Sequence, residues 1–255
     1  MDYKLIFVIL LIGHLLGYFY FQPQWMVERE NKEGRATLWH ELIYPAFIIL
    51  PFLLLFTAPW AVWGLILLVS LLRVVFNIVK GQYISQKPFF KERPLLMFAV
   101  YQAIHILALL SIARFYATCN TVAYSVIGAC LKEFYTSLHL DLSACELIRL
   151  VCLFLFLGEP VNVIVRKIIK TTTGKIDSNQ SAGDQKAGRV VGVLERYLTA
   201  ILIILEQYTA VGFAFTAKSV TRFSKISKDQ DFAEQYLIGT MSSLLFTLIG
   251  VILYR

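Results

Sequence analysis

The chain has 255 residues, of which 58% are hydrophobic and 16% are charged, and its mean hydropathy is +0.66. A soluble domain usually carries about 25% charged residues, so this composition argues against a soluble protein and makes lipid the expected solvent. The formal net charge of +7 would suit nucleic acid in a soluble protein. Here the basic residues lie in short loops beside apolar runs, as in membrane proteins, and no nucleic acid is expected as a partner.

The N-terminal half contains runs as long as a membrane-spanning helix, which needs about 20 apolar residues. In the first run, Gly13 and Gly17 form a G-x-x-x-G pair that would let a second helix approach closely. Residues 42–79 are too long for one span and are expected to fold back at Ala58–Pro59–Trp60. The four predicted spans are residues 5–22, about 41–58, 60–79 and 95–113.

The second half is less regular. Residues 115–145 contain no stretch long enough to span, and an interfacial or re-entrant helix is expected there. A fifth span, residues 146–168, is followed by a polar linker rich in Ser, Gly and Thr at residues 171–188. The sixth span is expected at about residues 197–217. Asp231 and Glu234 resemble a capping box before a seventh span that begins at Tyr236.

These runs predict an all-α, polytopic transmembrane helical bundle of about seven spans with no β-sheet, because the alternation typical of barrel strands is absent. The predicted domains are a five-span membrane block at residues 1–170, a flexible linker at 171–188 and a two-span block at 189–255. If all seven runs span, one side of the membrane receives 14 Lys and Arg and the other 8. The positive-inside rule then makes the first side cytoplasmic and places the N-terminus outside.

Ionisable residues inside membrane spans are candidates for function. The candidate polar cluster consists of His14, His40, His105, Gln102 and Glu206. Three histidines on three spans suit a zinc or proton-relay site, and they also suit the hydrogen bonds that hold neighbouring membrane helices together. The second interpretation is preferred, because no H-E-x-x-H pair is present.

Two further features bear on function. Glu206, near the middle of the predicted sixth span, could pair with Arg73, relay protons or face a water-filled cavity, and a structural pairing is preferred. Lys218, Ser219 and Arg222 cluster after that span, where a lipid-headgroup or anchoring role is expected. No phosphate-binding loop or nucleophile elbow occurs in the sequence.

Several sequence blocks resemble a bacterial membrane family known as domain of unknown function 3307. They are HLLGYFYFQPQWMVERENK (14–32), VFNIVK (75–80), YQAIHILALL (101–110), GRVVGVLERYL (188–198), FTAKSVTRF (215–223) and FAEQYLIGT (232–240). The resemblance implies a bacterial inner-membrane or phage-encoded protein and no stated activity. In the family, Asp usually stands where this chain has Tyr18, Asn77 and Tyr101. The resemblance therefore implies that any metal-dependent hydrolysis by the histidines is degenerate in this chain.

Two functions of different class follow. The first is a non-enzymatic integral membrane protein, acting as a scaffold, partner subunit or accessory protein. The alternative is an intramembrane metal-dependent hydrolase that uses His14, His40 and His105. No cofactor or metal is expected. The expected partners are the lipid bilayer and other membrane proteins or further copies of this chain, and the expected location is the inner or plasma membrane. The sequence leaves the reaction and the substrate open.

Overall fold

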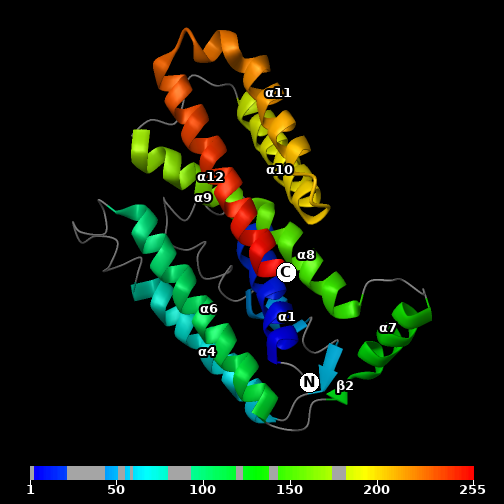
Figure 1. Cartoon of the computed structure of the whole chain (residues 1–255). Coiled ribbons are helices and arrows are strands. Elements are labelled where there is room, and N and C mark those ends of the chain that lie inside the picture. The colour runs from blue at the N-terminus through cyan, green and yellow to red at the C-terminus, as the bar shows by residue number, and fades with distance from the viewer. Residues whose placement is uncertain are drawn as a thin grey trace. The chain divides into compact units, whose positions relative to one another are not determined.

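The computed structural model describes residues 3–21, 44–50, 55–57, 60–79, 93–118, 123–137, 143–173 and 182–255. These residues are almost entirely helical (Figure 1), which confirms the all-α prediction. The chain divides into two compact units, residues 1–152 and 153–255. This division lies inside a helix, whereas the sequence places its boundary at the polar linker. Residues 174–181 of that linker lie outside the described residues, and residues 182–188 belong to a helix.

The N-terminal unit is built around its first helix. It contains α1 (Tyr3–Leu15), the short π-helix η1 (Leu16–Tyr20), α4 (Trp60–Val79), α6 (Pro94–Thr118) and α7 (Val126–Ser137). Helix α6 packs against both α1 and α4. The core between these helices is apolar and includes Ile6, Leu10, Ile66, Leu109 and Ile112. The bounds of α4 coincide with the predicted span at residues 60–79.

The paired glycines of α1 allow the close approach that the sequence predicts. A Cβ atom on Gly13 would lie 2.6 Å from the carbonyl oxygen of Phe47, in the helical segment 44–50. A Cβ on Gly17 would lie 3.1 Å from side-chain atoms of Tyr44 and Phe47. Only glycine leaves room for the backbone of this segment to lie against α1.

The predicted second span ends in a short extended segment instead of a helix. Within the described residues, β1 (Phe56–Thr57) pairs antiparallel with β2 (Ala123–Tyr124), two residues on each side. The hydroxyl of Tyr116 on α6 donates to the carbonyl oxygen of Thr57 at 2.6 Å and fixes this segment. The pairing is a small departure from the expected absence of β-sheet and leaves the all-α class unchanged.

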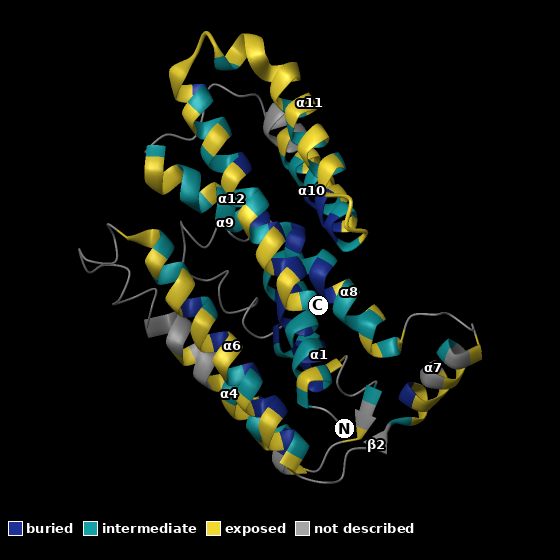
Figure 2. Cartoon of the chain, viewed as in Figure 1, coloured by how far each residue is buried: buried dark blue, intermediate teal, exposed yellow. Residues whose placement is uncertain are grey.

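The C-terminal unit is a group of packed helices. Its elements are α9 (Glu159–Thr173), α10 (Ala182–Ile204), α11 (Tyr208–Ile226), α12 (Gln230–Tyr254) and, from Leu153 onward, the end of α8 (Ala144–Leu157). Helix α12 packs against α9, α10 and α11, and α10 also packs against α9 and α11. Helix α11 has no buried residue, which Figure 2 shows as a mainly exposed helix.

The predicted single span at residues 197–217 is wrong. The chain turns at Leu205–Gln207, so that α10 and α11 form a helical hairpin. The amide of Gln207 donates to Leu202 and that of Glu206 to Ile203, which is the hydrogen-bond pattern of a Schellman cap. Glu206 takes the left-handed position with a φ of 60°, where glycine is usual. Hydropathy hides such a turn, because apolar residues flank it on both sides.

Contacts at several heights along the helices of this unit show whether each pair runs parallel or antiparallel. Arg196 of α10 contacts Ser243 of α12, and further along, Arg255 contacts Ile203, so α10 and α12 run parallel. Ser219 of α11 contacts Tyr236 near the start of α12, so α11 runs antiparallel to both. The hairpin therefore returns to the end of the unit at which α10 begins.

The start of α12 also differs from the prediction. The cap is Asp229, whose side chain accepts a hydrogen bond from the amide of Phe232 at 3.0 Å. Asp231 and Glu234, the predicted capping box, lie inside the first turns of the helix. Asp229 and Asp231 are both side-chain acceptors that could cap this helix. Asp229 is the cap because it has the extended backbone, with φ −133° and ψ 104°, that an N-cap requires.

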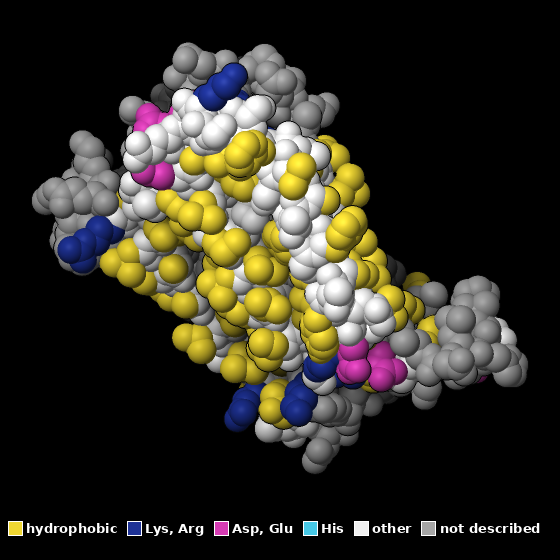
Figure 3. Space-filling model, turned by 45° about the horizontal axis from the view of Figure 1, so that its top comes forward, with side chains coloured by type: hydrophobic (Ala, Val, Ile, Leu, Met, Phe, Trp, Pro, Cys, Tyr) yellow, Lys and Arg dark blue, Asp and Glu magenta, His cyan; other side chains and the backbone are white. Residues whose placement is uncertain are grey.

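Within the described residues, four helices are long and apolar enough to cross a membrane, fewer than the seven spans predicted. They are Tyr3–Tyr20, Pro94–Thr118, Ala144–Thr173 and Gln230–Tyr254. Only 22% of the apolar window in each of α6 and α12 is buried inside the structure. Hydrophobic side chains accordingly cover much of the face shown in Figure 3. Such an exterior suggests a membrane protein, since a soluble monomer rarely exposes large contiguous apolar patches.

Candidate functional site

The N-terminal unit contains a buried cluster of uncharged polar and aromatic side chains. His14 of α1 and His105 of α6 are 1% and 6% exposed, and their ring centroids lie 5.7 Å apart. Nδ1 of His14 lies 2.5 Å from the hydroxyl of Tyr44, and its Nε2 lies 3.0 Å from Oε1 of Gln102. The ring of Tyr101 meets that of His105 edge-on at 4.3 Å between centroids.

These distances define the chemistry of His14. The amide oxygen of Gln102 only accepts, so Nε2 of His14 must carry the proton and donate it. Nδ1 is then unprotonated and accepts from the hydroxyl of Tyr44. A neutral imidazole with both nitrogens hydrogen-bonded is stable in a buried site and joins three helical segments. To bind a metal, it would first have to give up one of these hydrogen bonds.

The sequence-predicted cluster is thus partly assembled. His14, Gln102 and His105 come together, as expected for residues on α1 and α6. His40 lies outside the described residues, so the convergence of three histidines stays a prediction. Glu206 belongs to the other unit, where its carboxylate lies 3.7 Å from the guanidinium of Arg255. Among the residues that the structure describes, no group of three His, Cys, Asp or Glu side chains is placed to hold a metal ion.

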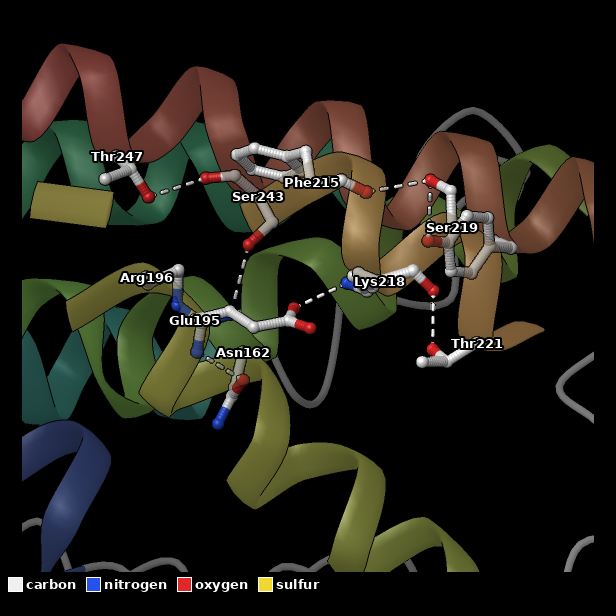
Figure 4. A network of polar contacts seen from close by, with 10 residues as sticks. Asn162, Glu195, Arg196, Phe215, Lys218, Ser219, Thr221, Ser243 and Thr247 are labelled. Carbon is white, nitrogen blue, oxygen red and sulfur yellow. Dashed lines mark hydrogen bonds and ion pairs between the residues drawn. The ribbon is translucent and has the colours of Figure 1, made fainter. Parts of the chain in front are cut away.

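A second polar site, which sequence reasoning missed, lies in the C-terminal unit and centres on Arg196 of α10 (Figure 4). This side chain is 4% exposed. Its Nε donates to the carbonyl oxygen of Leu157 at 2.6 Å, and its Nη2 donates to that of Gly158 at 3.2 Å. Nη2 also donates to Oδ1 of Asn162 at 2.6 Å, and Nη1 to the hydroxyl of Ser243 at 3.4 Å.

The backbone between α8 and α9 explains why an arginine lies here. The helix is interrupted at Gly158, and Pro160 in the first turn of α9 has no N–H to donate. The N–H missing at Pro160 would have bonded the carbonyl oxygen of Phe156, whereas the carbonyl oxygen of Gly158 accepts from the amide of Asn162 at 3.3 Å. In a membrane, backbone groups at such a break must be satisfied within the protein. Arg196 supplies a donor to the carbonyl oxygen of Leu157 and a second donor to that of Gly158.

Further charged residues surround this network. Nζ of Lys218 lies 2.5 Å from the carboxylate of Glu195, which joins α11 to α10. Lys218 also lies over the ring of Tyr236, 5.4 Å from its centroid. A cavity of about 220 Å³ opens among α9, α10, α11 and α12. We call it the basic cavity, and its lining includes Asn162, Gly188, Lys218, Arg222, Gln235 and Tyr236.

The periodicity of α10 is the signal that could have found Arg196. Thr199, Ala200 and Ile203 follow it at the spacing of one helical face, and all three are buried with it. An arginine on the buried face of a helix must be satisfied by hydrogen bonds. Glu206 lies nearer the centre of the predicted sixth span, whereas Arg196 lies just before its start.

Comparison with known proteins gives a family and no activity. No curated protein and no solved structure matches the chain. Residues 6–131 match the model of the family described as Protein of unknown function (DUF3307). The match includes His14, Gln102 and His105, and it ends before the three C-terminal blocks that resemble the family in sequence. Through its N-terminal half, the chain belongs to the DUF3307 family.

Proposed function

We propose that this protein is a non-enzymatic, multi-pass integral membrane protein that serves as a scaffold or partner subunit in the inner membrane of a bacterium. The observation that carries the proposal is the low burial of its apolar helices, 22% in the spanning windows of α6 and α12. Lipid can cover part of these faces, and the helices of a second membrane protein, or of a second copy, can cover the rest. The bacterial location rests on the resemblance to the family.

The buried histidines support a structural role over the hydrolase alternative. The two hydrogen bonds of His14 connect α1 to α6 and to the segment 44–50, which is how polar groups hold membrane helices together. Tyr18 and Tyr101 occupy the positions at which the family usually has carboxylates, and their rings lie 5.9 Å apart between centroids. A hydrolase of this design would need anionic or water-bearing ligands where these aromatic rings stand.

The helical hairpin favours a topology that differs from the one expected from the sequence. Because α11 runs antiparallel to α10, the hairpin returns the end of α11 to the side of the polar linker. This holds whether or not α10 and α11, which are not among the four spanning candidates, cross the membrane. The residues that change sides are Lys218, Arg222, Lys225, Lys228 and Arg255. The balance of Lys and Arg between the two sides changes from 14 against 8 to 17 against 5. A stronger bias fits the positive-inside rule better, so we place the linker in the cytoplasm and Arg255 outside.

Fusions to the end of the full-length chain test this topology. Alkaline phosphatase attached after Arg255 should be active, because it folds only outside the cytoplasm, and green fluorescent protein at the same position should be dark. The protein should also stay with the membranes during extraction at alkaline pH. A fluorescent fusion would place Arg255 in the cytoplasm, as the single sixth span predicts. Release from the membranes at alkaline pH would contradict the proposal of an integral membrane protein.

Native mass spectrometry of the detergent-purified chain tests the partner role. The expected result is a mass above the 29.1 kDa of one chain, from a second copy or a co-purified membrane protein. A chain that is monomeric and without a partner in mild detergent would contradict the scaffold proposal.

A further inference from the structure

We propose that the basic cavity of the C-terminal unit binds one phosphate group, carried by a lipid headgroup or by a soluble phosphate ester. The proposal rests on three observations that do not depend on one another: the charge of the lining, a buried amide that lacks an acceptor, and the volume and level of the cavity. It goes beyond the proposed scaffold role, since a scaffold needs no ligand.

The charge of the lining favours an anion. Lys218 and Glu195 both line the basic cavity and pair with each other, so their charges largely cancel. The ammonium of Lys218 nevertheless keeps further N–H groups for a ligand, because it has three donors. Arg222 lies one helical turn beyond Lys218 on α11 and forms no hydrogen bond or ion pair with the described residues. Its positive charge therefore has no counterpart there, and the planar guanidinium suits the oxygens of a phosphate.

A buried amide points to the same chemistry. Asn162 lines the cavity and is 9% exposed. Its Oδ1 accepts from Arg196 at 2.6 Å, and since a guanidinium only donates, the orientation of the amide is fixed. Nδ2 is left as a buried donor with no acceptor among the described residues, and in Figure 4 it is directed away from Arg196. Buried donors are rarely left unsatisfied, and an oxygen of a bound phosphate would supply the acceptor.

The cavity also has a suitable volume and position. Its 220 Å³ is less than the roughly 300–1,000 Å³ of sites for drug-sized ligands, and it suits a small charged group. A Cβ on Gly188 would meet nothing within 4 Å, so the wall is open at that residue. Tyr236 lies where the apolar part of α12 begins, the depth at which lipid headgroups meet hydrocarbon. Basic pockets between helices at this depth are a known way of binding lipid phosphates.

Thermal unfolding of the delipidated, full-length protein in neutral detergent tests the proposal. The probes are phosphatidylglycerol, glycerol 3-phosphate and, as the probe without phosphate, diacylglycerol. The two variants to compare are Arg222→Gln and Lys228→Gln. Each removes one positive charge from the same end of the unit, but only Arg222 lines the cavity. A third variant, Gly188→Leu, fills the cavity and leaves its charges in place.

A phosphate-bearing probe should raise the unfolding temperature of the unmodified protein, whereas diacylglycerol should not. Arg222→Gln should weaken the apparent affinity about tenfold, the loss expected for a charge-assisted hydrogen bond, and Gly188→Leu should abolish binding. Lys228→Gln should leave the affinity unchanged. Stabilisation by phosphatidylglycerol alone identifies a lipid as the source, and stabilisation by glycerol 3-phosphate identifies a soluble ester.

Two results would overturn the proposal. The first is an equal loss of affinity in Arg222→Gln and Lys228→Gln, which would mean that general surface charge attracts the probe. The second is undiminished binding by Gly188→Leu, which would place the ligand elsewhere. Because the assay is performed in detergent, neither result bears on the topology or on the scaffold role.

Discussion

The two units bury polar side chains in different ways. In the N-terminal unit, His14, Tyr44 and Gln102 form a neutral cluster in which each hydrogen bond joins two side chains. In the C-terminal unit, Arg196 carries a permanent charge and donates to the backbone carbonyl oxygens of Leu157 and Gly158 at a helix break. The neutral cluster can lose one hydrogen bond at a time. The arginine holds several acceptors together, so its loss should affect the whole unit.

The largest expected effect comes from Arg196→Met. The substitution keeps much of the side-chain length but removes the donor of Arg196 from the carbonyl oxygen of Leu157 and from Oδ1 of Asn162. We expect the free energy of unfolding to fall by about 3 kcal/mol. Unfolding in mixed detergent and sodium dodecyl sulfate measures it. The control is Arg222→Met, the same change on exposed α11, which should stay within about 0.5 kcal/mol. Equal effects of the two variants would contradict the role given to Arg196.

A methyl group at Gly13 should have the next largest effect, and it tests packing in the N-terminal unit. The added Cβ would lie 2.6 Å from the carbonyl oxygen of Phe47, so Gly13→Ala should cost about 1–3 kcal/mol through overpacking. Gly64→Ala is the control, because a Cβ there meets nothing within 4 Å. In the interior of α4 that change should be neutral or stabilise by up to about 1 kcal/mol. The same unfolding assay measures both, and a stable Gly13→Ala variant would show that the helices separate easily.

Glu206→Gly should have a smaller effect, in the stabilising direction. Glycine adopts the left-handed backbone of the hairpin turn without the steric strain of a side chain, and we expect a gain of about 0.5–1 kcal/mol. The ion pair lost with Arg255 is long, at 3.7 Å, and exposed, so it should contribute little. Glu206→Ala removes the same carboxylate but keeps the strain. If that variant is stabilised as much as Glu206→Gly, backbone strain is not the cause.

The last prediction concerns metal binding, for which no effect is expected. Both ring nitrogens of His14 are hydrogen-bonded, and Tyr18 and Tyr101 offer phenols where metal-bound histidines usually have carboxylate partners. We therefore expect no stoichiometric zinc or manganese in the purified protein by elemental analysis. The double variant Tyr18→Asp, Tyr101→Asp serves as the comparison, since it restores the carboxylates that the family usually has. Near-stoichiometric metal in the unmodified protein would contradict this prediction and favour the hydrolase alternative.

The sequence predicts the helical class and several helix positions well, because long apolar runs have few alternatives to helix. Its predictions fail where one residue decides between two backbone paths. The left-handed backbone of Glu206 turns one predicted span into a hairpin. Hydropathy cannot predict this turn, because it carries no information on the backbone angle φ. Asp229 outcompetes Asp231 as the cap of α12 because of its extended backbone.

The sequence likewise predicts one part of the polar sites and misses another. The sequence brings His14 and His105 together, since both lie on long apolar helices and each carries a polar group that needs a partner. Arg196 was missed because its role depends on carbonyl oxygens at Leu157 and Gly158, which lie far away in sequence. No local pattern records a contact of that kind, although the buried face of α10 shows that some acceptor must exist.

The helix break between α8 and α9 also has a consequence for biosynthesis. Arg196 donates to the carbonyl oxygen of Leu157, and the ribosome adds it 39 residues after Leu157. At about 5–20 residues per second, the interval is roughly 2–8 seconds. During that time the carbonyl oxygen of Leu157 lacks the donor of Arg196, and lipid cannot replace it. The α8–α9 segment is therefore expected to remain beside water or the insertion machinery until α10 emerges, and then to enter the bilayer together with it.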